Sequence, residues 1–182
     1  MIVVISGTNR PEARSKVVAG LVAGMLEEVG AASKVLDLAD LPGELFDPGS
    51  YAEKPAAFAP FQEAILQAQG IVTVVPEYNG SYPGVLKYFI DMLRFPESLA
   101  GVPAAFVGVA AGEWGGLRPV EQLEMVFQYR SAHLFGRRVF LKGIGSLLDD
   151  AGRLTDPAVE ARLRRMLEEF VAFARAVPRP GR

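Results

Sequence analysis

Short apolar runs alternate along this chain with longer segments in which apolar residues recur every three or four positions. Most of the runs have the length of a β-strand and are apolar throughout, which is typical of strands covered on both faces. The longer segments have the spacing of helices with one buried side. The predicted strands are 2–5, 33–38, 71–75, 102–109 and 138–141, and the predicted helices are 15–29, 55–69, 84–95, 117–130 and a last one with Asp156 as its cap and Pro157 as its first residue.

Because strands and helices alternate, the pattern predicts an α/β fold. We expect a doubly wound, five-stranded parallel sheet with helices on both faces. The 182 residues, half of them apolar, suffice for one core. We predict a single domain over residues 1–177 and a short frayed C-terminal tail at 178–182. Segment 41–54 is rich in Pro, Gly and acidic residues, so we predict a surface loop there.

Composition excludes several classes of function. The 19 basic and 21 acidic side chains leave a net charge of −2, which gives no electrostatic case for binding nucleic acid or an anionic membrane. The longest apolar runs are too short for a membrane-spanning helix. With no cysteine and one histidine, neither a disulfide nor a metal site is expected. We therefore expect a cytoplasmic protein that acts on small molecules.

The loop after the first predicted strand carries groups that suit a phosphate. Gly7 allows close approach of the backbone, Thr8 and Ser15 supply hydroxyls, and Arg10 supplies a fixed positive charge. The loop leads into a helix N-terminus, where unpaired N–H groups attract anions. An ordinary connection with Ser15 as the helix cap would also explain this loop. Neither the P-loop pattern nor the dinucleotide-binding glycine pattern is present.

Two further unusual loops follow the third and fourth predicted strands. The first of them, 76–84, has prolines near both ends, and its Asn79-Gly80 pair favours a turn with positive φ. The second, 111–116, combines three glycines with Trp114. Either could be a plain connection. However, ligands of open parallel sheets bind at the carboxyl ends of the strands, where all three loops must meet. The sequence therefore predicts one ligand site at that edge.

At these loops the sequence closely resembles the NAD(P)H-dependent FMN reductases, a flavodoxin-like family that includes quinone and azo-dye reductases. The resemblance runs over about residues 1–175 and is carried by 7–11 (GTNRP), 76–87 (PEYNGSYPGVLK), which is the most specific, and 115–116 (GG). It implies the strand order 2-1-3-4-5. The chain departs from the family at Ala13 and Arg14, where many members carry small polar residues.

The resemblance also implies FMN as the cofactor and assigns residues to it. The phosphate would be held by Thr8, Arg10 and Ser15. The isoalloxazine would be framed, largely through backbone, by Pro76, Glu77, Tyr78, Asn79, Gly80 and Ser81, and approached from its other side by Gly112, Gly115 and Gly116. No catalytic side chain is expected, because the flavin carries the chemistry.

The implied function is an oxidoreductase that transfers hydride from NADPH or NADH, through bound FMN, to a small acceptor. The acceptor could be a quinone, a free flavin, an azo compound or a metal oxyanion, and the sequence does not choose between NADH and NADPH. Two alternatives stay open: a flavodoxin-type electron carrier and a non-catalytic flavin-binding regulatory protein. Carriers are usually strongly acidic, which this chain is not.

Segment 84–95 is apolar nearly all round the predicted helix. One face can cover the sheet, and the rest needs another cover. We therefore expect a homodimer or tetramer that associates through helix 84–95, and the resemblance implies the same.

Overall fold

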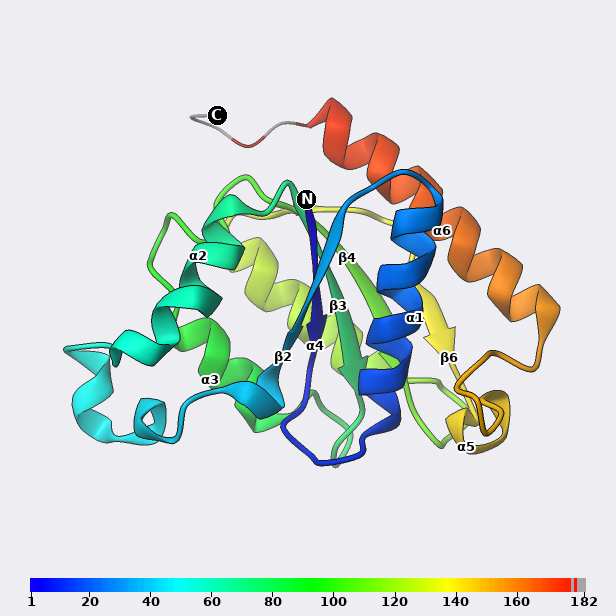
Figure 1. The fold of residues 1–182 in the computed structure, drawn as a ribbon, viewed down its shortest axis with the longest axis horizontal. Coiled ribbons are helices and arrows are strands. Elements are labelled where there is room, and N and C mark those ends of the chain that lie inside the picture. Colours follow the sequence, from blue (N-terminus) through cyan, green and yellow to red (C-terminus); the bar gives the residue numbers. More distant parts are fainter. Residues whose placement is uncertain (178, 180–182) are drawn as a thin grey trace.

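The computed structural model describes residues 1–177 and 179, and its strands form one parallel sheet. The strands are β1 (Ile2–Ser6), β2 (Ser33–Asp37), β3 (Gly70–Pro76), β4 (Pro103–Val109), β5 (His133–Leu134) and β6 (Val139–Leu141). Their order is β2-β1-β3-β4-β5, as predicted, and every pairing is parallel. The carboxyl ends of the strands point to the lower edge of the molecule in Figure 1.

The edge of the sheet beyond β4 differs from the prediction, which placed one strand at 138–141. Two short strands share that edge. β5 pairs with the start of β4, at Pro103 and Ala104, and β6 pairs with its end, at Val107 to Val109. Between them the chain leaves the sheet at Gly136, which is exposed. A strand of two residues carries no periodicity, so the sequence pattern could not reveal β5.

Helices cover both faces of the sheet, as predicted. The helices are α1 (Arg14–Glu28), α2 (Ala59–Gln67), α3 (Gly84–Met92), α4 (Leu117–Tyr129), α5 (Ile144–Leu147) and α6 (Pro157–Ala176), and 3₁₀ turns occupy Leu38–Asp40, Gly43–Phe46, Pro48–Tyr51 and Ala56–Phe58. One core lies between the sheet and α1 and α6, and the other between the sheet and α2, α3 and α4 (Figure 1). The four-residue helix α5 was not predicted.

Local signals set the helix ends. Asp156 caps α6 as predicted, because its carboxylate accepts hydrogen bonds from the N–H groups of Ala158 and Val159, at 2.8 and 3.3 Å. α3 ends at Met92, three residues earlier than predicted. Leu93, the residue after the helix, is already extended, with φ of −72° and ψ of 146°, although the apolar pattern of the sequence continues to Phe95.

Segment 41–54, predicted as a plain surface loop, is folded onto α3. Leu45 is fully buried in the core, and Tyr88 of α3 donates a hydrogen bond to its carbonyl at 2.6 Å. The ring of Phe46 stacks on Tyr88 with 5.0 Å between centroids, and Tyr51 meets the same ring edge-on. The chain itself therefore covers Tyr88 on the outer side of α3.

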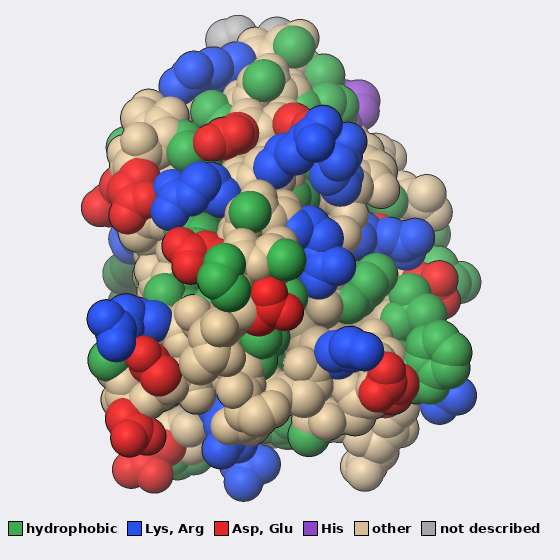
Figure 2. Space-filling model, turned by 90° about the vertical axis from the view of Figure 1, so that its right-hand side faces the viewer, with side chains coloured by type: hydrophobic (Ala, Val, Ile, Leu, Met, Phe, Trp, Pro, Cys, Tyr) green, Lys and Arg blue, Asp and Glu red, His purple; other side chains and the backbone are tan. Residues whose placement is uncertain are grey.

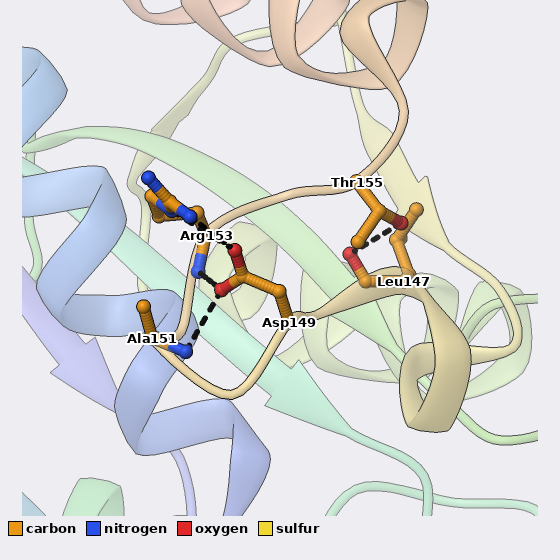
Figure 3. Close-up of polar contacts among 5 residues, drawn as sticks. All are labelled: Leu147, Asp149, Ala151, Arg153 and Thr155. Atoms are coloured by element: carbon orange, nitrogen blue, oxygen red, sulfur yellow. Dashed lines mark hydrogen bonds and ion pairs between the residues drawn. The ribbon is translucent and has the colours of Figure 1, made fainter.

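The connection from α5 to α6 is a tight turn built around one carboxylate (Figure 3). Asp149 accepts hydrogen bonds from the N–H groups of Ala151 and Arg153, at 3.0 and 2.8 Å, and from the Arg153 side chain at 2.9 Å. The backbone bond from Arg153 is the main cause that lowers the pKa of Asp149. Thr155 closes the turn by donating to the carbonyl of Leu147 at 3.3 Å. The turn is therefore held by its own contacts.

Acidic and basic side chains are interspersed on the face that Figure 2 shows. Ion pairs on the surface of the protein include Arg164 with Glu28 at 2.6 Å and Arg165 with Glu169 at 3.0 Å. Among residues 1–177 and 179, no helix is long and apolar enough to cross a membrane. The same residues contain no group of three His, Cys, Asp or Glu side chains that could hold a metal ion.

The predicted frayed tail falls mainly on residues 178 and 180–182, which lie outside the described residues. Arg179 is described, and it is buried. Its guanidinium donates to the carbonyls of Ile65 and Leu66, both at 2.8 Å, and of Ser98 at 2.6 Å. Arg179 is therefore bonded to the rest of the fold and is not frayed.

Candidate functional site

The loops after β1, β3 and β4 meet at the carboxyl edge of the sheet, as the sequence predicted (Figure 1). They enclose a hollow of about 440 Å³. Its lining residues are Arg10, Pro11, Glu12, Ala13, Arg14, Ser15, Pro76, Glu77, Tyr78, Val109, Ala110, Ala111 and Ile144. All three loops contribute to this one hollow, which makes it the candidate site.

A larger hollow, of about 630 Å³, lies between α1, α6 and the turn at Asp149. Its charged side chains already pair with one another: Arg164 with Glu28 at 2.6 Å, and Arg153 with Asp149 at 2.9 Å. The hollow at the strand edge instead contains the buried hydroxyl of Ser15, which has no hydrogen-bond partner. We therefore assign the ligand site to the strand edge.

The N-terminus of α1 forms the polar end of the site. The helix starts at Arg14 after Ala13, and no side chain caps it. Ser15 lies inside the first turn and is 3% exposed, and its hydroxyl has no hydrogen-bond partner. The alternative of Ser15 as an ordinary helix cap is therefore wrong. Arg10 and Arg14 line the same hollow. Free amides, an unpartnered hydroxyl and guanidinium groups are what a phosphate monoester binds.

Thr8, predicted to hold a phosphate, does not line the hollow. It is 1% exposed. Its hydroxyl lies 2.9 Å from the hydroxyl of Tyr78 and accepts a hydrogen bond from the N–H of Arg10 at 3.2 Å. The structure therefore places Thr8 between the first and second loops and behind the surface of the site.

The second loop is a tight hairpin. Tyr78 and Ser81 exchange two backbone hydrogen bonds of 2.8 and 3.0 Å across Asn79 and Gly80. Asn79 has φ of 53° and Gly80 of 77°, which confirms the predicted turn. The Ser81 hydroxyl donates to the side-chain carbonyl of Gln122 on α4. The hairpin is therefore rigid on its own and braced from α4.

The predicted ring-binding residues of this loop are divided between the hollow and the hairpin. Pro76, Glu77 and Tyr78 line the hollow, whereas Asn79, Gly80 and Ser81 do not. The N–H of Glu77 is already bonded to the carbonyl of Val109 at 3.1 Å.

The glycines of the third loop allow close backbone packing. Gly115 and Gly116 are buried, with φ of 57° and 87°. A Cβ on Gly116 would lie 2.8 Å from the backbone nitrogen of Val109 in β4. Gly112 is exposed, and none of the three lines the hollow. Beside them, Glu113 pairs with Lys142 at 2.8 Å, and this hydrogen bond lowers the pKa of Glu113.

Sequence reasoning missed the residues that the fourth strand and α5 supply to the hollow. Ala110 and Ala111 follow β4 directly, and Ile144 begins α5. Their small or apolar side chains gave no chemical signal. The position of the two alanines just after a predicted strand could have identified them. Ile144 could not be found this way, because α5 was not predicted.

Known proteins resemble this chain in sequence over most of its length. The profile of the NADPH-dependent FMN reductases matches residues 1–145. A quinone reductase of Escherichia coli K12 is 32% identical over 168 residues, covering 87% of this chain and 88% of that protein. An NAD(P)H-dependent FMN reductase of Pseudomonas aeruginosa is 30% identical over 145 residues, covering 77% and 78%.

A solved structure shows the same fold. FerB, a flavoenzyme NAD(P)H:acceptor oxidoreductase from Paracoccus denitrificans, superposes with a TM-score of 0.83 over 97% of this chain and 98% of that one, at 20% identity. The fold and the family profile therefore agree. This chain belongs to the NADPH-dependent FMN reductase family.

Proposed function

We propose that the hollow at the strand edge binds FMN, with the phosphate at the N-terminus of α1 and the isoalloxazine along the second and third loops. The protein uses this cofactor to pass electrons from NAD(P)H to a small acceptor. One observation carries the placement: the buried Ser15 hydroxyl has no partner and lies at an uncapped helix N-terminus that lines the hollow. A phosphate oxygen would satisfy it.

The roles of the residues follow from their positions. Ser15, Arg10 and the first amides of α1 bind the phosphate. Pro76 to Tyr78 form one wall for the ring, and the rigid hairpin Asn79 to Ser81 fixes that wall. Gly115 and Gly116 let the third loop pack against β4, so that Ala110 and Ala111 face the site. When bound, FMN accepts a hydride and passes its electrons on; these residues hold it and shape the surface where substrates stack.

Trp114 offers a direct test, because it is the single tryptophan of the chain and lies in the third loop, 66% exposed. Titrating FMN into the flavin-free protein should quench the fluorescence of Trp114 through energy transfer to the flavin. Ser15→Ala should weaken binding of FMN but leave that of riboflavin, which lacks the phosphate, unchanged. Protein that stays colourless after dialysis from excess FMN, with no quenching, would contradict the proposed site.

The proposal extends to the identities of the electron acceptor and of the nicotinamide. The relative from Escherichia coli is named a quinone reductase, and we propose a quinone as the acceptor here. Turnover of NADH and of NADPH should then be fast with a quinone and show ping-pong kinetics, because both substrates use the same flavin face in turn. An electron carrier would bind FMN equally well but oxidise almost no NAD(P)H. The predicted cytoplasmic location stays a prediction.

Self-association is proposed for the end of α3. Phe46 and Tyr51 cover Tyr88 on the outer side of this helix. The need for a partner subunit, which was predicted from the apolar outer side, therefore applies to the part of the helix beyond Tyr88. Phe95 and Tyr129 line one hollow there and are 64% and 79% exposed. Two large aromatic side chains exposed together are typical of an interface.

Sedimentation of the double variant with Phe95→Asp and Tyr129→Asp tests this proposal. We expect wild-type dimers or tetramers and a monomeric variant, because a charge in an apolar interface costs desolvation. Val35→Asp, an exposed apolar position on β2, is the control and should keep the wild-type mass. A monomeric wild-type protein would refute self-association.

A further inference from the structure

Arg118 is an exposed cation at the carboxyl edge of the sheet that the proposed FMN site does not use. It lies in the first turn of α4, two residues after Gly116. A Cβ on Gly80, at the tip of the hairpin in the second loop, would lie 4.0 Å from the Nη1 atom of Arg118. The guanidinium therefore lies beside the hairpin that is proposed to fix the wall for the flavin ring.

The acidic side chains nearest to Arg118 along the chain are paired with other cations. Glu113 pairs with Lys142 at 2.8 Å, and Glu121 lies 3.8 Å from Arg138. Within the part of the chain that the structure describes, the Arg118 side chain has no hydrogen-bond or ion-pair partner. A cation in the first turn of a helix also opposes the helix dipole, and no acidic residue lies in that turn. The charge of Arg118 therefore contributes little to the fold and is available to an anionic ligand.

The cations at this edge are divided between the two faces of the sheet. Arg10 and Arg14 line the hollow at the start of α1, which packs on one face, whereas α4 packs on the other. In the proposed site the α1 side binds the phosphate of FMN. A second phosphate-bearing ligand that stacks on the same ring would be repelled by that phosphate, so its own phosphates need a separate cation. Arg118 supplies one, and its planar set of donors matches phosphate oxygens.

We infer that Arg118 binds a phosphate group of the nicotinamide substrate, which is either the pyrophosphate bridge or the 2′-phosphate that only NADPH carries. The inference rests on the proposed FMN site, because the nicotinamide must reach the flavin ring beside the same hairpin. Arg118 is then a binding residue for the electron donor and takes no part in holding FMN.

Steady-state kinetics of Arg118→Gln test this assignment. Loss of a charge-assisted hydrogen bond should raise KM for NADPH about tenfold, while kcat and KM for the quinone stay at their wild-type values. An equal rise for NADH identifies the pyrophosphate as the bound group, and a rise for NADPH alone identifies the 2′-phosphate. Because the guanidinium is exposed, high salt should raise KM of the wild type toward that of the variant.

Two further variants control for the loss of charge. Arg118→Lys keeps a cation without the planar donors and should recover part of the affinity for NADPH. Arg162→Gln removes an exposed arginine from α6, which packs on the other face of the sheet, and should leave KM unchanged. Wild-type KM for both nicotinamides in Arg118→Gln, the same rise in Arg162→Gln, or a fall in kcat at unchanged KM would each overturn the inference.

Binding of FMN separates this inference from the proposed function. Arg118→Gln should bind FMN with wild-type affinity, measured by the fluorescence of Trp114. If the wild-type protein binds no flavin, the proposed site fails. If the wild type binds FMN and oxidises NADPH, but Arg118→Gln binds FMN more weakly or sediments at a different mass, Arg118 supports the hairpin or a subunit contact. In that case the proposed function holds and only the inference about Arg118 is wrong.

Discussion

Gly7 is the position where one methyl group should do the most damage to the site. In Gly7→Ala the new Cβ would lie 2.6 Å from the carbonyl oxygen of Val74 and 3.1 Å from Leu86. The first of these is a backbone atom of a buried central strand, so it cannot turn away as a side chain could. Overpacking of this kind typically costs about 1–3 kcal/mol.

The matched control is the same substitution in α1. Around Gly20 an added Cβ would meet no atom within 4 Å. Replacing an exposed glycine inside a helix by alanine stabilises a protein by about 0.5–1 kcal/mol. The free energies of unfolding of Gly7→Ala and Gly20→Ala should therefore differ by about 1.5–4 kcal/mol, with opposite signs relative to the wild type.

Urea unfolding of the flavin-free proteins measures this difference, provided that all three share one m-value. In thermal unfolding, each kcal/mol corresponds to about 2–4 °C for a chain of this size. Gly7→Ala should also bind FMN more weakly, because the first loop must move away from β3. If Gly7→Ala is as stable as the wild type, the loops after β1 and β3 can move apart without loss of stability. Their close contact would then not be what fixes the geometry of the site.

Two other substitutions test contacts outside the site. Asp149→Asn should destabilise the protein at neutral pH. Because the fold lowers the pKa of Asp149, the stabilisation by this carboxylate is present above the unfolded pKa of about 3.9 and is lost as pH falls. The difference in free energy of unfolding between variant and wild type should therefore disappear in acid. Arg130→Met removes the hydrogen bonds to the carbonyls of Ile90 and Arg94, at 3.1 and 2.7 Å, and should cost about 1–3 kcal/mol in urea unfolding; an unchanged midpoint would contradict a role in holding the end of α3.

Much of the architecture could be read from local patterns. The strands β1, β3 and β4 are buried throughout and are apolar in the sequence, so their length and flanking turns identified them. Asp156 and Pro157 marked the start of α6 because capping is a contact within one turn. Asn79 and Gly80 marked a positive-φ turn for the same reason.

The three loops meet at the carboxyl edge as the sequence predicted, but the residues that line the hollow between them were predicted only in part. Residues 76–78 line the hollow as expected, while Ala110, Ala111 and Ile144 carry no chemical signal. Gly115 and Gly116 pack the third loop against β4. Such roles depend on which backbone lies a few ångströms away, and the pattern of residues along the chain does not contain that information.

By itself, the sequence determined the alternation of strands and helices, the turns and caps that punctuate it, and the edge of the sheet where the loops meet. These depend on periodicity, backbone preferences and chain direction, which are local properties. Only the tertiary structure decided that Thr8 faces Tyr78, that Ser15 lies unpartnered inside α1, and that Phe46 covers Tyr88. These contacts, and the missing partner of Ser15, result from how segments distant in the sequence pack together. A hydroxyl or a ring interacts with whichever groups the fold places beside it.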